Sequence, residues 1–159
     1  QKKHIMVQNL DEIDIRILRV MQENCRITTK ELAARIHLST TATYERLRRL
    51  EVMGIFHGYV AVLDAEKLER GFVVFCNIAM SHINQDIVRE FTERIQEWPE
   101  VSECYNVSGE FDYMLKVFCK SMDMYQQFVV RTIGTLEHVC RVQSVFVMDT
   151  LKLTYGIKI

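Results

Sequence analysis

One stretch of the chain brings hydroxyl, phenol and guanidinium groups together at helical spacing. It begins at Ser39 and runs to about Met53. Guanidinium groups pair in bidentate fashion with guanine edges, and hydroxyls hydrogen-bond to bases or to phosphate oxygens. The polar side chains of this stretch are therefore our candidate DNA-binding residues: Ser39, Thr40, Thr41, Thr43, Tyr44, Arg46, Arg48 and Arg49.

A helical wheel at about 100° per residue divides this stretch into two faces. The inward arc is mostly apolar and comprises Ala42, Thr43, Leu47, Leu50 and Met53. The outward side carries groups suited to a major groove, namely Thr41, Tyr44, Glu45 and Arg48. Arg46 falls on the apolar arc, where it either extends to a backbone phosphate or pairs with an acidic residue of the same unit. The simpler alternative for the whole outward face is a solvated basic helix surface.

The elements that must position this helix begin shortly before it. Asp11, Thr28 and Ser39 are good N-caps for three successive helices, and Glu31 completes a capping box with Thr28. Two short helices joined by a tight turn, the second rich in arginine, are typical of a helix-turn-helix. The turn position that often holds glycine is His37 here, and histidine tolerates positive φ better than most residues.

The second half of the chain alternates strand-like and helix-like patterns in the order β-α-β-β-α-β, which is ferredoxin-like. The expected strands are 72–80, 101–107, 112–119 and 141–151, and the expected helices are 85–98 and 122–136. The predicted fold class is therefore α+β. Its predicted parts are a flexible arm (1–9), a winged-helix-like helix-turn-helix domain (10–54), a linker with an extended segment (55–70) and a ferredoxin-like domain (71–159).

The strands of this second domain are apolar on both faces. In the stretch 72–80, Val74 and Cys76 alternate with Val73 and Phe75. The helices of a ferredoxin-like fold cover one face only, so a lone domain should alternate apolar and polar residues. A second cover is needed, and the sheet of an identical subunit is the simplest one. The rival cover is the linker or the N-terminal domain.

Composition and charge exclude several other classes. Of the 159 residues, 48% are apolar and 26% are charged, which is globular composition rather than disorder. No apolar run approaches the ~18 residues of a membrane helix. The cysteines lack C-x-x-C spacing and the histidines lack H-x-x-x-H spacing, so we expect reduced thiols, no metal and a cytoplasmic protein. Residues 1–60 hold 10 Lys/Arg against 7 Asp/Glu, and residues 61–159 hold 10 against 14, which favours two modules with different partners.

A series of motifs extends over nearly the whole chain, from Leu10 to about Lys152. They are Leu10-Asp11, Asp14, Ile17-Leu18, Arg26, Glu31-Leu32-Ala33, Leu38-Ser39, Glu45-Arg46, Arg49-Leu50-Glu51, Gly54-Ile55, Gly58-Tyr59 and Val107-Ser108-Gly109-Glu110-Phe111-Asp112-Tyr113. In this order and spacing the chain resembles the Lrp/AsnC family, the feast/famine regulators of bacteria and archaea. The resemblance implies a helix-turn-helix that binds double-stranded DNA and a ferredoxin-like effector domain, called RAM. It also implies homodimers that pair through their sheets and assemble into octamers or other rings.

The resemblance further implies an effector pocket at the G-x-x-D-Y loop, between subunits of an oligomer. The residues expected there are Asn106, Ser108, Gly109, Glu110, Asp112, Met148 and Thr150. A free amino acid carries a carboxylate, which N–H groups around Gly109 can receive, and an ammonium, which Asp112 can receive. Met148 and Thr150 are included as neighbours on the predicted last strand. The alternative is that Gly109 only supplies a turn and Asp112 bonds local backbone N–H groups.

We therefore expect a sequence-specific DNA-binding transcriptional regulator, modulated by a small effector such as an amino acid. The chain has no P-loop, no G-x-G-x-x-G and no G-x-S-x-G motif, so we expect no catalytic residue and no cofactor. Two alternatives stay open. Some haem-pathway (sirohaem) decarboxylases resemble the same two-part architecture, although the net acidic second half argues against an anionic tetrapyrrole. The other alternative is an oligomeric sensor that does not contact DNA.

Overall fold

The computed structural model describes residues 10–159, and the chain divides into two compact units. One unit contains the residues up to Val62 together with Lys152–Ile159, and the other is Leu63–Leu151. The predicted arm, residues 1–9, lies outside the described residues. The final segment groups with the N-terminal unit rather than with the domain expected over 71–159. Its extended backbone bonds to the first helix, where the Ile157 N–H donates to Gln22 Oε1 at 2.6 Å.

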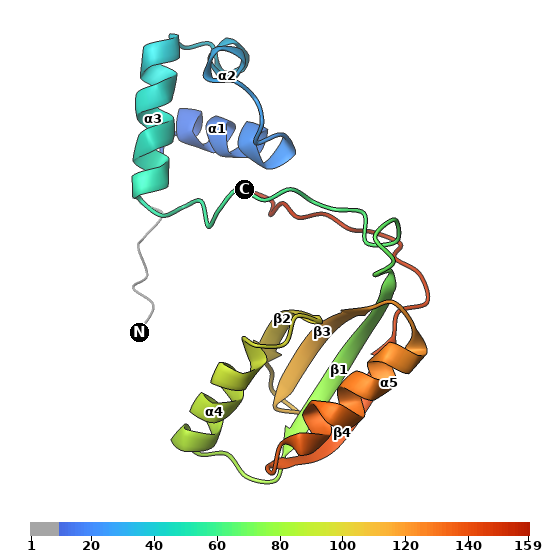
Figure 1. Cartoon of the computed structure of the whole chain (residues 1–159). Coiled ribbons are helices and arrows are strands. Elements are labelled where there is room, and N and C mark those ends of the chain that lie inside the picture. The colour runs from blue at the N-terminus through green and yellow to red at the C-terminus, as the bar shows by residue number, and fades with distance from the viewer. Residues whose placement is uncertain (1–9) are drawn as a thin grey trace. The chain divides into compact units, whose positions relative to one another are not determined.

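Between residues 10 and 62 the structure contains three helices, blue to cyan in Figure 1: α1 (Glu12–Glu23), α2 (Thr29–Ile36) and α3 (Thr40–Val52). The three predicted N-caps are confirmed, because the side chains of Asp11, Thr28 and Ser39 each accept a backbone N–H of the following turn. His37 takes the left-handed conformation between α2 and α3, with φ of 60°. The turn therefore forms without glycine, as predicted.

One side of each helix supplies the core of this unit. Ile17 of α1, Leu32 of α2 and Leu50 of α3 are at most 1% exposed and belong to one apolar cluster. Phe56, which follows α3, packs against the same cluster. Burying a large apolar side chain contributes about 1.5–3 kcal/mol. The apolar arc of α3 thus fixes which of its faces remains outside.

The second unit has the predicted ferredoxin-like order. Its elements are β1 (Phe72–Met80), α4 (Gln85–Ile95), β2 (Val101–Asn106), β3 (Tyr113–Cys119), α5 (Met122–Arg131), the 3₁₀ turn η1 (Ile133–Thr135) and β4 (Val139–Phe146). The strands form one antiparallel sheet in the order β2-β3-β1-β4. The α+β fold class predicted from the sequence is confirmed.

Three elements differ from the prediction by more than one residue at an end, whereas β2 and β3 differ by a single residue. α4 ends at Ile95, three residues before the expected Trp98, because the chain tightens into a turn ahead of Pro99. α5 ends at Arg131 and passes into η1, which contains Gly134. β4 spans Val139–Phe146 rather than 141–151, because β1, with which it pairs, begins at Phe72 and provides few partners beyond that point.

The sheet is covered on one face by its own unit. Figure 1 shows α4 and α5 on the same side of the strands, and strand side chains on that side, such as Val74 and Leu115, are wholly buried. On the opposite side Val73 and Phe75 are half-buried, and Val145 is 47% exposed. The predicted two-sided apolarity is therefore confirmed, and residues 63–151 leave the second face of the sheet uncovered.

Candidate nucleic-acid interface and effector loop

The outward face of α3 is polar and open to solvent. Tyr44 has 54% of its surface exposed. The other exposed candidates on this face are Ser39, Thr40, Thr41 and Arg48. Every ion pair that α3 makes within residues 10–159 involves one of the other two arginines, so the guanidinium of Arg48 is available to a partner. The free N–H groups of the first turn of α3 add donors for an anion.

Thr43 does not belong to this surface. Its side chain is wholly buried, and its hydroxyl donates to the carbonyl oxygen of Ser39 at 2.9 Å. The prediction that Thr43 binds DNA was wrong, because the inward arc of the helix places it inside the unit. Ser39 caps α3 through its Oγ, which accepts the Ala42 N–H at 3.2 Å and still has a hydroxyl proton to donate.

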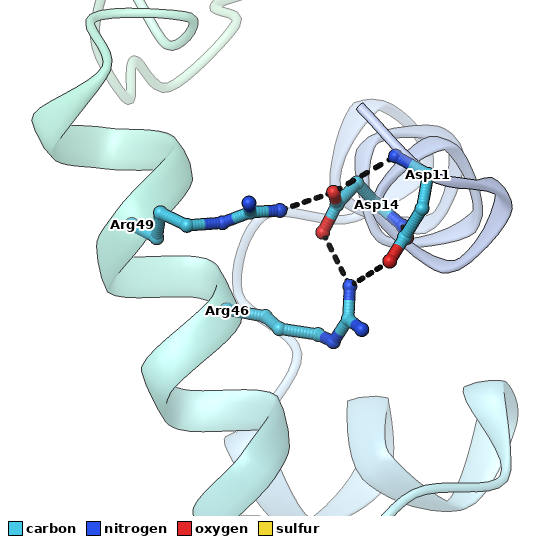
Figure 2. A network of polar contacts seen from close by, with 4 residues as sticks. All are labelled: Asp11, Asp14, Arg46 and Arg49. Carbon is cyan, nitrogen blue, oxygen red and sulfur yellow. Dashed lines mark hydrogen bonds and ion pairs between the residues drawn. The ribbon is translucent and has the colours of Figure 1, made fainter. Parts of the chain in front are cut away.

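Figure 2 shows that Arg46 and Arg49 point from α3 toward the start of α1. Arg46 Nη1 lies 2.6 Å from Asp11 Oδ2 and 2.9 Å from Asp14 Oδ1. Arg49 Nη2 donates to Asp14 Oδ2, which also accepts the Asp11 N–H at 3.1 Å. Of the two roles that the wheel left open for Arg46, the structure contains the pairing with acidic residues. Arg49 is paired with Asp14 in the same way. Neither guanidinium is therefore as free as that of Arg48 to bind a partner.

This network surrounds a buried carboxylate. Asp14 has no exposed surface, whereas the side chains of Arg46 and Arg49 are 29% and 46% exposed. A buried charge is tolerated when it is paired and hydrogen-bonded. The Asp14 N–H, and after it the Arg46 guanidinium, lower the pKa of Asp11 below its ordinary value. The hydrogen bond to Asp11 is in turn the main cause that raises the pKa of Arg46. Charge as well as packing therefore ties α3 to α1.

The loop between β2 and β3 turns at Gly109, whose φ of +118° suits glycine. Asp112 Oδ2 accepts the Met80 N–H at 2.7 Å, and the Asp112 N–H donates to the Ile78 carbonyl at 2.9 Å. Asn106 Nδ2 donates to the Asp112 carbonyl at 3.0 Å. Asp112 thus ties the loop to the end of β1, and one of its two carboxylate oxygens is committed to the fold.

The other expected effector residues divide into two groups. Ser108 and Glu110 are exposed in the same loop. Met148 and Thr150 were expected as neighbours on the last strand in a pocket between subunits; they lie beyond the end of β4, and within one chain they are not next to the loop. β4 ends at Phe146, which pairs with the far end of β1, and Met148 beyond it is 95% exposed. The start of β4, not its end, lies next to the loop.

Arg141 is the residue near this loop that the sequence reasoning missed. Its Nη2 donates to the Glu110 carbonyl at 3.2 Å and lies 3.8 Å from Glu110 Oε2. Its guanidinium carbon lies 4.5 Å from the centre of the Phe111 ring, within cation–π range. Arg141 and Glu110 are 31 residues apart in the chain, so no local pattern connects them.

Residues 10–159 contain neither a membrane-spanning helix nor a cluster of metal ligands. No helix in that range is long and apolar enough to cross a membrane. No group of three or more His, Cys, Asp and Glu side chains there is placed to hold a metal ion.

A helix-turn-helix with an exposed polar face is an architecture of proteins that bind the major groove of DNA, and in this chain a ferredoxin-like domain follows it. The AsnC-type helix-turn-helix family matches residues 10–51, and the Lrp/AsnC ligand binding domain family matches residues 73–157. The chain belongs to the Lrp/AsnC family of helix-turn-helix transcriptional regulators, as the resemblance indicated.

Named relatives span almost the whole chain. The Bkd operon transcriptional regulator of Pseudomonas aeruginosa is 35% identical over 91% of this chain and 94% of its own length. The leucine-responsive regulatory protein of Escherichia coli strain K12 is 36% identical over 91% of this chain and 88% of its own length. The crystal structure of a Neisseria meningitidis transcriptional regulator in complex with L-Met is similar with a TM-score of 0.90, at 36% identity over 94% of this chain and 96% of that one.

Proposed function

We propose that this chain is a sequence-specific DNA-binding regulator that acts in the cytoplasm and places α3 in the major groove. The proposal rests on the difference in ion pairing among the three arginines of α3. Arg46 and Arg49 are paired with carboxylates of α1, whereas Arg48 faces solvent on the same side as Thr41 and Tyr44. An unpaired guanidinium on an exposed helix face is free to form a bidentate pair with guanine. The names of the relatives support a regulator rather than a decarboxylase.

The open face of the sheet supports homodimerisation within this proposal. Val73, Phe75 and Val145 leave apolar surface there. Asn77 lies on the same face, and its Oδ1 is buried without a hydrogen-bond partner among residues 10–159. A buried acceptor needs a donor, which the facing sheet of a second copy can bring. A dimer presents two copies of α3, so the operator is expected to be pseudo-palindromic, and dimers are expected to assemble into octamers or similar rings.

A small-molecule effector completes the proposal, and we expect it to be an amino acid. Relatives are named leucine-responsive, and one solved relative is a complex with L-Met. In this chain the loop from Ser108 to Asp112 carries exposed polar groups, and we place the effector there, between subunits.

Fluorescence anisotropy with a labelled duplex of the chain's own operator tests the DNA-binding part. Arg48→Ala is expected to weaken specific binding by about 1–3 kcal/mol and to relax sequence preference at one base position. Arg16→Ala is the matched control, because Arg16 lies on α1 and pairs with Glu12 at the surface. Affinity of the wild-type chain should also fall steeply with salt as counterions are released. Unchanged affinity and sequence preference in Arg48→Ala would show that Arg48 does not contact the bases of the operator.

A further inference from the structure

Arg141 lies beside the loop from Ser108 to Asp112, here called the effector loop. Its guanidinium makes only a long ion pair with the Glu110 carboxylate. Arg141 lies near the start of β4, opposite Ala79 of β1. The distance of 3.8 Å between its Nη2 and Glu110 Oε2 is longer than the ~2.7–2.9 Å of a charge-assisted hydrogen bond. The Glu110 side chain is 81% exposed and that of Arg141 is 54% exposed, so solvent weakens their attraction further.

The Arg141 guanidinium is nevertheless held in place by the loop. Phe111 lies under it at 4.5 Å, and the Glu110 carbonyl accepts one of its N–H groups at 3.2 Å. A planar guanidinium fixed on an aromatic ring presents its remaining N–H groups as a fork. Such a fork matches the two oxygens of a carboxylate, and Glu110 does not fill it in a bidentate manner.

We propose that Arg141 binds the α-carboxylate of the amino-acid effector, and that Glu110 is the internal carboxylate that occupies Arg141 when no effector is bound. This inference rests on the proposed effector function. In this exchange the effector carboxylate replaces Glu110 on the Arg141 guanidinium, and the exposed Glu110 side chain returns to solvent. Arg141 thereby takes the carboxylate that N–H groups around Gly109 were expected to receive, and Asp112, whose Oδ2 accepts the Met80 N–H, keeps its other oxygen for the ammonium.

Isothermal titration calorimetry on the full chain tests the exchange. The probes are L-Met and L-Leu, with 3-(methylthio)propylamine and isopentylamine as analogues that keep the side chain and amine but lack the carboxylate. The wild-type chain should bind the amino acids and bind the amines at least about tenfold more weakly, because a hydrogen-bonded charge pair is lost. Arg141→Gln should weaken L-Met and L-Leu binding by at least about tenfold. The affinity of Arg141→Lys should lie between that of the wild type and that of Arg141→Gln.

For Glu110→Gln we expect the opposite change in amino-acid affinity. Removing the internal competitor should tighten amino-acid binding by about two- to fivefold, the range expected for an exposed ion pair. A gain of affinity cannot arise from misfolding, so this variant keeps the test informative if Arg141→Gln is unstable. Arg131→Gln on α5 is the matched control and should bind as the wild type does.

Several results would overturn the assignment. Wild-type affinity in Arg141→Gln, equal binding of the amines, or unchanged or weaker binding in Glu110→Gln would each leave Arg141 as a structural clamp on the loop. No binding of any of the twenty amino acids by the wild-type chain would refute both this inference and the effector part of the proposed function. DNA affinity measured without amino acid reports the DNA-binding part separately.

Discussion

Asp14→Asn removes the charge at the centre of the α1–α3 network while keeping the size of the side chain. The substitution leaves Arg46 and Arg49 without their shared carboxylate, although Arg46 retains Asp11 at 2.6 Å. Removing one partner of a fully buried pair costs about 3–5 kcal/mol. Both guanidinium groups are partly exposed and can regain water, so we expect about 2–3 kcal/mol of lost unfolding free energy, below the fully buried range.

Urea unfolding with two probes measures this loss. Far-UV circular dichroism reports all the helices, whereas the single tryptophan, Trp98, packs edge to face on Phe91 and Phe128 in the sheet unit. Asp14→Asn should lower the unfolding free energy of the helical unit and move the Trp98 transition less. Glu12→Gln, which removes an exposed i,i+4 pair with Arg16, is the control and should change stability by at most about 0.5 kcal/mol.

The same variant should weaken DNA binding, although Asp14 is buried and makes no contact with a duplex. Without the Asp14 ion pairs α3 is held less rigidly on α1, so its DNA-facing side is less preorganised. Ordering this side on binding costs free energy and lowers the affinity. A variant that unfolds within about 0.5 kcal/mol of the wild type would show that packing alone orients α3 and would refute the reasoning.

Three further predictions concern other parts of the chain. Thr28→Ala removes the capping box in which Thr28 Oγ1 accepts the Glu31 N–H at 3.2 Å, and urea unfolding should show a loss of about 1 kcal/mol that Thr29→Ala does not reproduce. Val145→Glu places a charge on the open face of the sheet, so light scattering should show a lighter particle than the wild type at equal concentration; an unchanged mass would exclude this face from the dimer interface. Hydrogen bonds with Asp14 and Thr28 lower the pKa values of Asp11 and Glu31 below their ordinary 3.8 and 4.5. Because their folded pKa values are depressed, their stabilisation is present above those ordinary values and is lost as pH falls through the lowered ones, so acid titration of Asp11→Asn should show a shallower loss of stability below about pH 4 than the wild type.

Local features of this protein could be predicted from the sequence because their causes act over a few residues. The N-caps Asp11, Thr28 and Ser39 bond to N–H groups only three residues away, and the left-handed turn at His37 depends on the conformation of one residue. Alternating apolar residues set the two faces of β1, and helical spacing set the inward arc of α3. The order of the elements followed from these patterns, and the order is sufficient to define a ferredoxin-like sheet.

Pairings between distant residues were decided only by tertiary structure. Asp14 lies 32 and 35 residues from its two arginine partners, and Arg141 lies 31 residues from Glu110. Composition shows that such charges exist, but the docking angle of the helices and the register of β4 on β1 determine which of them meet. The sequence by itself therefore determined that α3 is a basic helix with one apolar arc. The packed structure assigned two of its arginines to the fold and left Arg48 exposed, because a guanidinium pairs with the carboxylate that packing brings within hydrogen-bond distance.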